Sequence, residues 1–286
     1  MLDTARRSIK RRIHRAAEAV TKALIRVFRL DARKLYYESS GILKHVGYAS
    51  GEKWLVEQFL PRLLSDIDEP VLLDIGANVG EYSIALAKSL PSCRCYAFEP
   101  NPITFKELAA NTGSISNIRL FNCGASSKGQ RRRIFVYKSD SSTGHASLYR
   151  DVFKEFHLQD DGNIGSLACS MERIDELVES RIIAEAEIHF IKIDTEGHEL
   201  ESLKGMLGVI RGGGVRALQF EFNEMNVISR VFLKDFYDIL GDEWSFFRLD
   251  TKKLISLGHR YDPANEIFKF QNIVAIRKCF LHHSCL

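Results

Sequence analysis

Through most of the chain, short apolar runs rich in β-forming residues alternate with segments whose apolar positions repeat at helical spacing. Seven apolar runs predict buried strands, at residues 71–75, 95–98, 118–123, 188–193, 215–220, 244–249 and 272–276. Helices are predicted before and between them, at 51–65, 84–88, 103–111, 200–207 and 232–240. This alternation predicts an α/β fold with a doubly wound, mainly parallel sheet. Because no helix-length segment separates the last two strands, we expect them to form an antiparallel hairpin at an edge of the sheet.

The alternation of strands and helices is interrupted between residues 127 and 170. An arginine-rich run at 131–137 predicts an additional strand, and residues 139–147 are predicted to form a polar loop. A helix is then expected over 171–177. A long insertion near the carboxyl ends of the strands is a typical place for substrate recognition. The insertion either recognises the acceptor or is a surface segment without a functional role.

The N-terminal segment carries a basic amphipathic pattern. Apolar residues from Ile9 to Phe28 recur at helical spacing, with Lys and Arg mostly on the other faces. Residues 1–34 contain 11 Lys and Arg against three acidic residues, so this segment has a net charge of +8 and the remainder −5. The pattern predicts either peripheral contact of residues 1–30 with an anionic membrane or packing on the domain or on a second subunit, and contact with RNA is a minor third alternative. The acidic remainder argues against a nucleic acid as partner of the main domain.

Composition is that of an ordinary globular protein, with 45% hydrophobic and 27% charged residues. No apolar run approaches the ~20 residues of a membrane span, and no secretory signal is recognised. The six cysteines are scattered, as expected for reduced thiols in a cytoplasmic protein. We predict an N-terminal helical extension (1–49), a main domain (50–278) containing the insertion, and a C-terminal tail (279–286). That tail has four side chains of metal-binding type, but a frayed terminus is the favoured interpretation: Cys279, His282, His283 and Cys285.

The first predicted strand leads through a glycine turn into a helix, which suits a nucleotide-like ligand. The spacing of Gly76 and Gly80 differs from the G-x-G-x-x-G pattern of NAD-binding folds. Asp74 lies two residues before Gly76, where a carboxylate suits an amino group better than a phosphate. Glu99 ends the next strand, 23 residues after Gly76, at the usual position of a ribose-binding acid. S-adenosylmethionine, which has an amino acid end, a ribose and no phosphate, fits these residues best.

A second group of polar residues follows the fourth predicted strand. Because the carboxyl ends of neighbouring parallel strands share one crevice, Asp194, Glu196 and His198 are expected close to the two acids described above. Methyl transfer to a hydroxyl needs a base for the hydroxyl proton, and we favour this group as its source. The simpler interpretation is that Asp194 or Thr195 caps the following helix and that acids in its first turn, such as Glu199, interact favourably with its dipole. A divalent-cation site with Asp194, Glu221 and Asn223 is a minor alternative, and no metal is predicted.

As a set, the motifs resemble the FkbM family of S-adenosylmethionine-dependent methyltransferases. The matching stretches are Asp74-Ile75-Gly76-Ala77-Asn78-Val79-Gly80, Phe98-Glu99-Pro100-Asn101-Pro102, and residues 191–199 and 271–275. They occur in the family's order over about residues 50–278. The resemblance implies a seven-stranded, Rossmann-like class I methyltransferase fold with an antiparallel terminal hairpin. It also implies that Ala125 lies near the adenine of the cofactor. The other residues that it implies for cofactor binding are Asp74, Gly76, Asn78, Gly80, Glu99 and Asn101.

The sequence therefore predicts an S-adenosylmethionine-dependent O-methyltransferase whose acceptor is a hydroxyl of a sugar, a glycan or a polyketide-like small molecule. Asp194, Glu196 and His198 are the predicted catalytic residues, and the first two match the family's signature after the fourth strand. Two alternatives remain open, an N-methyltransferase of a protein or nucleic acid and a non-catalytic S-adenosylmethionine-binding protein. Enzymes that methylate nucleobase amines commonly have an Asn/Asp-Pro-Pro-aromatic turn, where this chain has residues 194–197.

Overall fold

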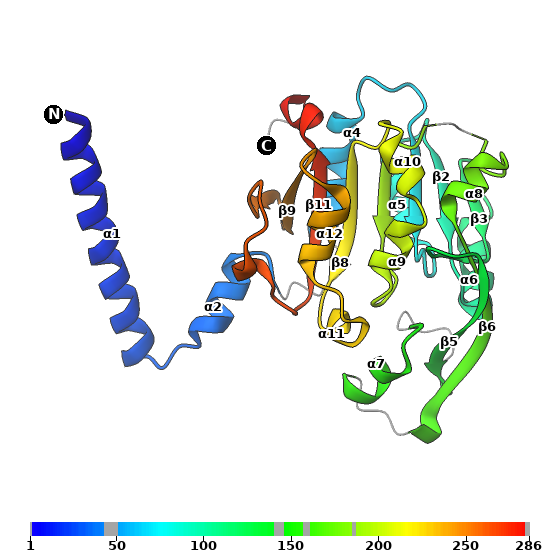
Figure 1. Ribbon diagram of the computed structural model, residues 1–286, viewed down its shortest axis with the longest axis horizontal. Helices are drawn as coiled ribbons and strands as arrows, with labels where there is room; N and C mark the ends of the chain where they lie inside the picture. The colour runs from blue at the N-terminus through cyan, green and yellow to red at the C-terminus, as the bar shows by residue number, and fades with distance from the viewer. Residues whose placement is uncertain (1, 43–50, 140–145, 157–160, 185–186, 284–286) are drawn as a thin grey trace.

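A central sheet of eight strands organises the molecule (Figure 1). The structure is a computed structural model that describes residues 2–42, 51–139, 146–156, 161–184 and 187–283. The strand order is β10-β9-β11-β8-β7-β1-β2-β3. The strand bounds are β1 (Val71–Ile75), β2 (Arg94–Phe98), β3 (Ile118–Phe121), β7 (Phe190–Ile193), β8 (Ala217–Phe222), β9 (Trp244–Asp250), β10 (Lys253–Ser256) and β11 (Gln271–Arg277).

All seven predicted strands are present, and the doubly wound, mainly parallel class I sheet is confirmed. The predicted count of seven is one too low, because β10 adds an eighth strand by pairing with β9. The last two predicted strands, β9 and β11, pair antiparallel as expected. Their predicted place at the sheet edge is wrong, since β11 also pairs with β8 and β10 occupies the edge.

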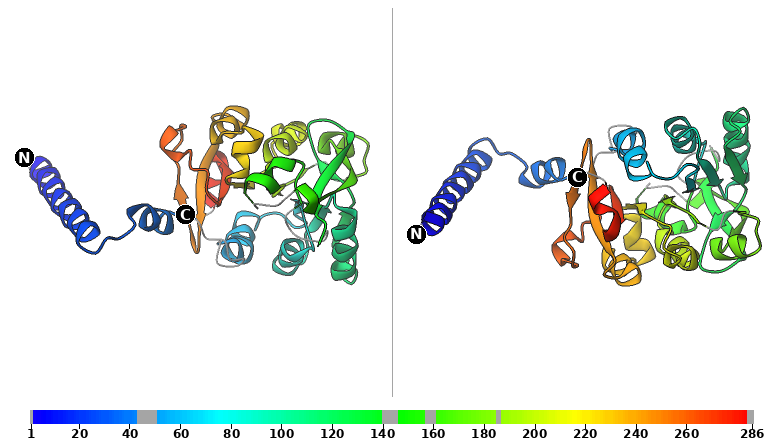
Figure 2. Two further views of the ribbon diagram at one scale, coloured as in Figure 1. Left: turned by 90° about the horizontal axis from the view of Figure 1, so that it is seen from below. Right: turned by 90° about the horizontal axis from the view of Figure 1, so that it is seen from above.

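Helices cover both faces of the sheet, which explains why strands such as β1 and β7 are buried along their whole length (Figure 2). One face carries α3 (Glu52–Trp54), η2 (Leu55–Phe59), α4 (Leu60–Leu63), α5 (Glu81–Ser89) and α6 (Pro102–Thr112). The other carries α8 (Ile174–Glu179), α9 (Glu199–Lys204), α10 (Leu207–Arg211) and α12 (Leu233–Leu240). The helix predicted over 51–65 is thus three short segments, of which η2 is a π-helix.

The insertion forms a second, three-stranded sheet. Its strands are β4 (Gly124–Ala125), β6 (Ile164–Glu172) and β5 (Gln130–Tyr137), in that order. The helix α7 (Arg150–Glu155) lies beside this sheet. The predicted extra strand is confirmed as β5. The predicted start of a helix at residue 171 is wrong, because Met171 pairs with Gly124 and Gln130 inside this sheet and α8 begins at Ile174. Most of the predicted polar loop 139–147 lies outside the described residues.

The predicted amphipathic helix is present as α1 (Leu2–Val27), followed by α2 (Ala32–Ser39). In Figures 1 and 2 α1 extends away from the sheet and its covering helices. The remaining segments are α11 (Met225–Ser229), η3 (Asp161–Asn163), η4 (Pro263–Asn265) and η5 (Lys278–His283). Within the described part of the chain, no helix combines the length and apolar character that a membrane span requires.

Candidate active site

The carboxyl ends of β1, β2 and β7 meet at Gly76. The Gly76 N–H donates to the Phe98 carbonyl at 2.9 Å, and the Asp194 N–H donates to the Ile75 carbonyl at 2.9 Å. Gly76 has a φ of +83°, and a Cβ on it would lie 1.7 Å from the Asp194 carbonyl oxygen. Only glycine fits here, since any side chain would collide with the neighbouring strand end.

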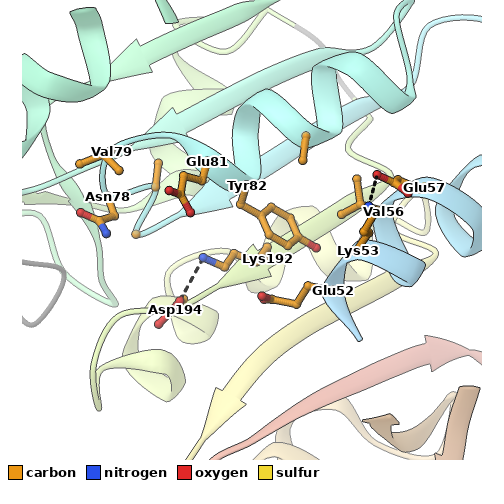
Figure 3. Close-up of a pocket in the computed structure, with 13 residues that line it drawn as sticks. Glu52, Lys53, Val56, Glu57, Asn78, Val79, Glu81, Tyr82, Lys192 and Asp194 are labelled. Carbon is orange, nitrogen blue, oxygen red and sulfur yellow. Dashed lines mark ion pairs between the residues drawn. The ribbon is translucent and has the colours of Figure 1, made fainter. Parts of the chain in front are cut away.

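Two cavities lie on either side of this point and share Gly76, Asn78 and Asp194. The first, the helical cavity, has a volume of about 180 Å³ and extends between α3, η2 and α5 (Figure 3). The second, the insertion cavity, has a volume of about 80 Å³ and extends from Glu99 and Glu196 toward the insertion. A ligand that crosses the shared residues would therefore occupy both cavities.

Glu99 is fixed at the end of β2 by backbone donors. Its Oε2 accepts the Asn78 N–H at 2.9 Å, and its Oε1 accepts the Asn101 N–H at 2.8 Å. Burial raises the pKa of this carboxyl to about 7, against the lowering effect of the two backbone hydrogen bonds. Glu99 lines the insertion cavity, where each carboxylate oxygen has a further lone pair available to a ligand hydroxyl.

Lys192 lies between two of the predicted site acids. Its Nζ is 3.1 Å from Asp194 Oδ2 and 3.6 Å from Asp74 Oδ1, and 5.1 Å from the centre of the Tyr82 ring. Figure 3 shows Lys192 reaching toward Asp194 with the Tyr82 ring beside it. Burial alone would lower the pKa of this lysine, but the carboxylates of Asp194 and Asp74 raise it above its usual value. Lys192 is therefore a fixed positive charge.

A row of polar side chains continues from Lys192 beneath the helical cavity. Gln219 lies beside Lys192 in the β7–β8 register. Its Oε1 accepts the Tyr82 hydroxyl at 2.5 Å, and its Nε2 donates to Glu52 at 2.8 Å and to Asn272 at 3.1 Å. The row fixes Glu52 in the wall of the helical cavity.

The loop between β7 and α9 is shaped by Glu199. Its Oε1 accepts the N–H groups of Thr195 and Gly197, both at 3.0 Å. Glu196 has a φ of +54°, a region that non-glycine residues enter rarely, and Gly197 follows with a φ of +99°. Glu199 thus has a structural role in the first turn of α9, as the simpler interpretation of the sequence predicts.

His198 uses both ring nitrogens in contacts within the protein. Nε2 is 3.0 Å from the Ser126 hydroxyl, and Nδ1 is 3.2 Å from the Tyr149 hydroxyl. Burial lowers the pKa of this imidazole to about 4, and Arg132 lowers it further. His198 lines the insertion cavity as a neutral ring that connects the insertion to the loop after β7.

Several carboxyl groups lie close together around Asp194. Burial raises the pKa values of Glu196 and Glu221, and the nearby Asp194 raises both further. Asn223 donates its side-chain N–H to Glu221. No group of three His, Cys, Asp or Glu side chains within the described ranges is arranged as a metal site.

The predicted site residues divide into two groups. Six line at least one cavity: Gly76, Asn78, Glu99, Asp194, Glu196 and His198. The other four lie behind the cavity walls, all buried: Asp74, Gly80, Asn101 and Ala125. Asp74 has no exposed surface and accepts the Ser83 hydroxyl at 2.5 Å, so it meets the site through Lys192. Asn101 caps α6 and supports Glu99.

Lys192 and Thr104 are among the site residues that were not predicted. Lys192 is the only charged residue in the mostly apolar predicted strand 188–193. Its charge in such a strand is a signal by which the sequence could have identified it as a site residue. Thr104 lines the insertion cavity from α6, and its helical context gives no such signal.

Comparison with known proteins identifies the family. The model of the methyltransferase FkbM domain matches residues 74–241. The AMB antimetabolite synthetase AmbE of Pseudomonas aeruginosa is 30% identical over 164 residues, which are 48% of this chain and 8% of that protein. The hexuronic acid methyltransferase AglP of Haloferax volcanii is 30% identical over 161 residues, which are 54% of this chain and 58% of AglP. The chain thus spans less than two thirds of either relative.

Among solved structures, the O-methyltransferase from Bacillus cereus in complex with SAH has a TM-score of 0.42 and 12% sequence identity. The similarity covers 91% of this chain and 97% of that one. A TM-score below 0.5 is too low to assign a function from this structure. The family model, in contrast, matches more than half of the residues, and the chain belongs to the FkbM methyltransferase family.

Proposed function

We propose that the protein transfers the methyl group of S-adenosylmethionine to a hydroxyl of a sugar, a glycan or a polyketide-like small molecule. The observation that carries this proposal is the position of Asp194, which lies where the two cavities meet and is paired with Lys192 at 3.1 Å. The donor's ribose would bind Glu99 in the insertion cavity, and its amino acid end would extend past Gly76 into the helical cavity. The buried acceptor atoms at Glu99 suit ribose hydroxyls.

The proposed reaction is an in-line displacement. An acceptor oxygen attacks the methyl carbon, the new C–O bond forms as the C–S bond breaks, and the sulfur leaves as a thioether with the electron pair. Alignment of these three atoms can supply ~7–11 kcal/mol. Asp194 takes the hydroxyl proton, which contributes about 10²–10⁴-fold in rate. Glu196 lines the same cavity wall and faces the acceptor in this proposal, while His198 positions the loop.

Charge around the site supports a neutral acceptor. Asp194, Glu196 and Glu221 lie close together, and the nearby Lys192 is already paired with Asp194 and Asp74. An acceptor carboxylate, such as that of a uronic acid, would be repelled by the Asp194 carboxylate, and it would find Lys192 already paired. A hydroxyl has no charge and can donate a hydrogen bond to them.

A labelled-methyl assay tests the proposal. Full-length protein is incubated with labelled S-adenosylmethionine and a panel of neutral sugars, uronic acids and lipid-linked glycan extracts. We expect incorporation into a neutral hydroxyl acceptor and a loss of about 10²–10⁴-fold in Asp194→Asn. Glu107→Gln, a matched change at an exposed acid of α6 outside both cavities, should leave near-normal activity. Incorporation into protein or nucleic-acid nitrogen would favour the N-methyltransferase. Donor binding without any incorporation would favour a non-catalytic protein.

We also propose that α1 brings the protein to anionic membranes. The helix carries most of the basic charge of the first 34 residues, and it extends away from the domain in every view (Figures 1 and 2). Its apolar side is left exposed, with Ile13 64% and Val27 73% accessible. A basic helix with an uncovered apolar side suits an anionic interface. A glycan acceptor carried on a lipid would then lie near the site.

A further inference from the structure

Three consecutive arginines lie near the start of β5, and the alternation of side chains along a strand divides them between its two faces. Arg131 and Arg133 are exposed on one face. Arg132 is half-buried and shares the other face with Ile134, which is 3% exposed and lines the insertion cavity. Arg132 therefore lies on the cavity side of β5, beside a residue of the cavity wall.

The charge of Arg132 acts on the two side chains that join the insertion to the loop after β7. Burial and then Arg132 lower the pKa of His198. Burial raises the pKa of Tyr149, and Arg132 opposes this effect. The Tyr149 hydroxyl lies 3.2 Å from the Nδ1 of His198, and His198 lines the insertion cavity. Because the interaction between charges weakens with distance, the guanidinium lies close to this pair, on the insertion side of the cavity.

Arg132 has no acidic partner in the part of the chain that the structure describes. Its backbone carbonyl accepts a hydrogen bond from a thiol, but its guanidinium makes no ion pair or hydrogen bond there. Lys192, in contrast, pairs with Asp194 at 3.1 Å, and Glu201, which acts on the same histidine, pairs with Lys204 at 2.6 Å. A half-buried charge without a counter-ion is unfavourable, so this guanidinium is suited to an anion that binds from the cavity.

The chemistry of the two substrates indicates which of them carries this anion. The donor has no phosphate, and its carboxylate belongs to the amino acid end, which is proposed to lie beyond Gly76 in the helical cavity. The anion then belongs to the acceptor. A carboxylate on the reacting sugar ring would lie near Asp194 and be repelled, whereas a phosphate attached outside the ring can reach the insertion. The guanidinium fork matches phosphate oxygens in a bidentate contact.

We propose that Arg132 binds a phosphate group of the acceptor, so that the preferred acceptor is a glycosyl phosphate, either free or carried on a lipid. The inference rests on the proposed methyl transfer to a hydroxyl and specifies the class of its acceptor. The sugar hydroxyl at Asp194 is neutral, as the charge there requires, and the phosphate extends toward β5. A neutral sugar without phosphate remains a weaker acceptor. The insertion then recognises the acceptor, which is one of the two roles that the sequence allows for it.

Calorimetric titration of the full-length protein, saturated with S-adenosylhomocysteine, with inorganic phosphate tests the anion site. The salt concentration is chosen to screen the exposed basic residues of α1. We expect Arg132→Gln to bind phosphate at least about tenfold more weakly than the wild type. Arg131→Gln removes the same charge from the opposite face of β5 and should leave the affinity within about twofold. Absence of phosphate binding by the wild type, or an equal loss in both variants, would overturn the proposal.

The melting temperature separates this role from a structural one. Neither guanidinium has a partner within the described residues, so both variants should melt like the wild type. Affinity for S-adenosylhomocysteine should also be unchanged in Arg132→Gln. A lower melting temperature in Arg132→Gln, with phosphate affinity unchanged, would show that the side chain supports the fold and would overturn the proposal.

Matched acceptors test the same contact during methyl transfer. The labelled-methyl assay compares a sugar 1-phosphate, the methyl glycoside of the same sugar and the same sugar phosphate linked to a polyprenyl chain. We expect the phosphorylated acceptors to have a kcat/KM at least about tenfold above that of the methyl glycoside, and Arg132→Gln to abolish this difference. The better of the two phosphorylated acceptors identifies the source of the phosphate. Equal kcat/KM for all three would overturn the proposal, whereas failure of the wild type to bind the donor would overturn the proposed function.

Discussion

At the scale of single residues, Glu99 is the group whose protonation most directly controls the proposed donor site. Its buried carboxyl has a pKa raised to about 7, so below that pH it is mainly protonated in the free protein. A protonated carboxyl has fewer acceptor sites for the ribose hydroxyls. Donor binding should therefore strengthen as the pH rises through 7.

This dependence can be measured with S-adenosylhomocysteine between pH 6 and pH 8. One pH unit below the pKa, the carboxylate fraction falls by about tenfold, and the affinity at pH 6 should be lower than at pH 8 by up to that factor. Glu99→Gln, which does not titrate, should bind more weakly at pH 8 and show a flat profile. A wild-type affinity that is constant over this range would contradict the role of Glu99.

Lys192 and Asp74 form a second prediction at this scale. Asp74 is fully buried, so removal of the lysine leaves its charge without compensation. We expect Lys192→Met to lower the free energy of unfolding by about 3 kcal/mol. The double variant Asp74→Asn, Lys192→Met should recover a large part of that loss, as measured by denaturant unfolding. Additive losses in the two single variants would show that the two side chains are not coupled.

At the scale of elements, the loop from β7 into α9 depends on one carboxylate. Glu199 Oε1 accepts the N–H groups of Thr195 and Gly197, and burial raises the pKa of Glu199 to about 7. Glu199→Ala should lower stability by about 1–3 kcal/mol, because one buried and one half-buried backbone donor lose their acceptor. Hydrogen exchange of the Thr195 and Gly197 amides should become faster, with the amides of β1 unaffected. Unchanged exchange at these two positions would mean that the loop does not need this side chain.

The elements also show what the sequence could predict. Strands such as β1 and β7 are buried along their length and consist mostly of apolar residues, because helices cover both faces of the sheet, and such runs are recognisable without the fold. The end of β6 was not recognisable, because the residues from Met171 onward have a helical pattern and only pairing with β4 and β5 makes them a strand. The place of β11 between β8 and β9 likewise depends on long-range pairing.

For the site, the positions of Glu99, Asp194 and Glu196 after predicted strands indicated that they lie at one edge of the sheet, and they line one cavity there. Sequence could not show that Asp74 is covered by α5, since that depends on how the helix packs. It also could not show that His198 is engaged at both ring nitrogens, because Ser126 and Tyr149 are distant in the chain. Contacts across the fold decide which of the candidate side chains face the cavities.

At the scale of the whole molecule, the basic helix α1 stands apart from an acidic main domain. Full-length protein should float with vesicles that contain phosphatidylserine and remain unbound with purely phosphatidylcholine vesicles. Val20→Asp with Val27→Asp should reduce flotation at least about tenfold, since the apolar side is then charged. Ile182→Asp, a change at a 52% exposed apolar residue of the main domain, serves as the control. Equal binding to both vesicle types, or no effect of the α1 changes, would contradict membrane docking.

The central claim is that one donor molecule binds across the ends of β1, β2 and β7, and its most direct test is calorimetric titration with S-adenosylmethionine. The wild type should bind one molecule per chain, and Glu99→Ala should bind at least about tenfold more weakly. Failure of the wild type to bind, or equal affinity in Glu99→Ala, would contradict the claim.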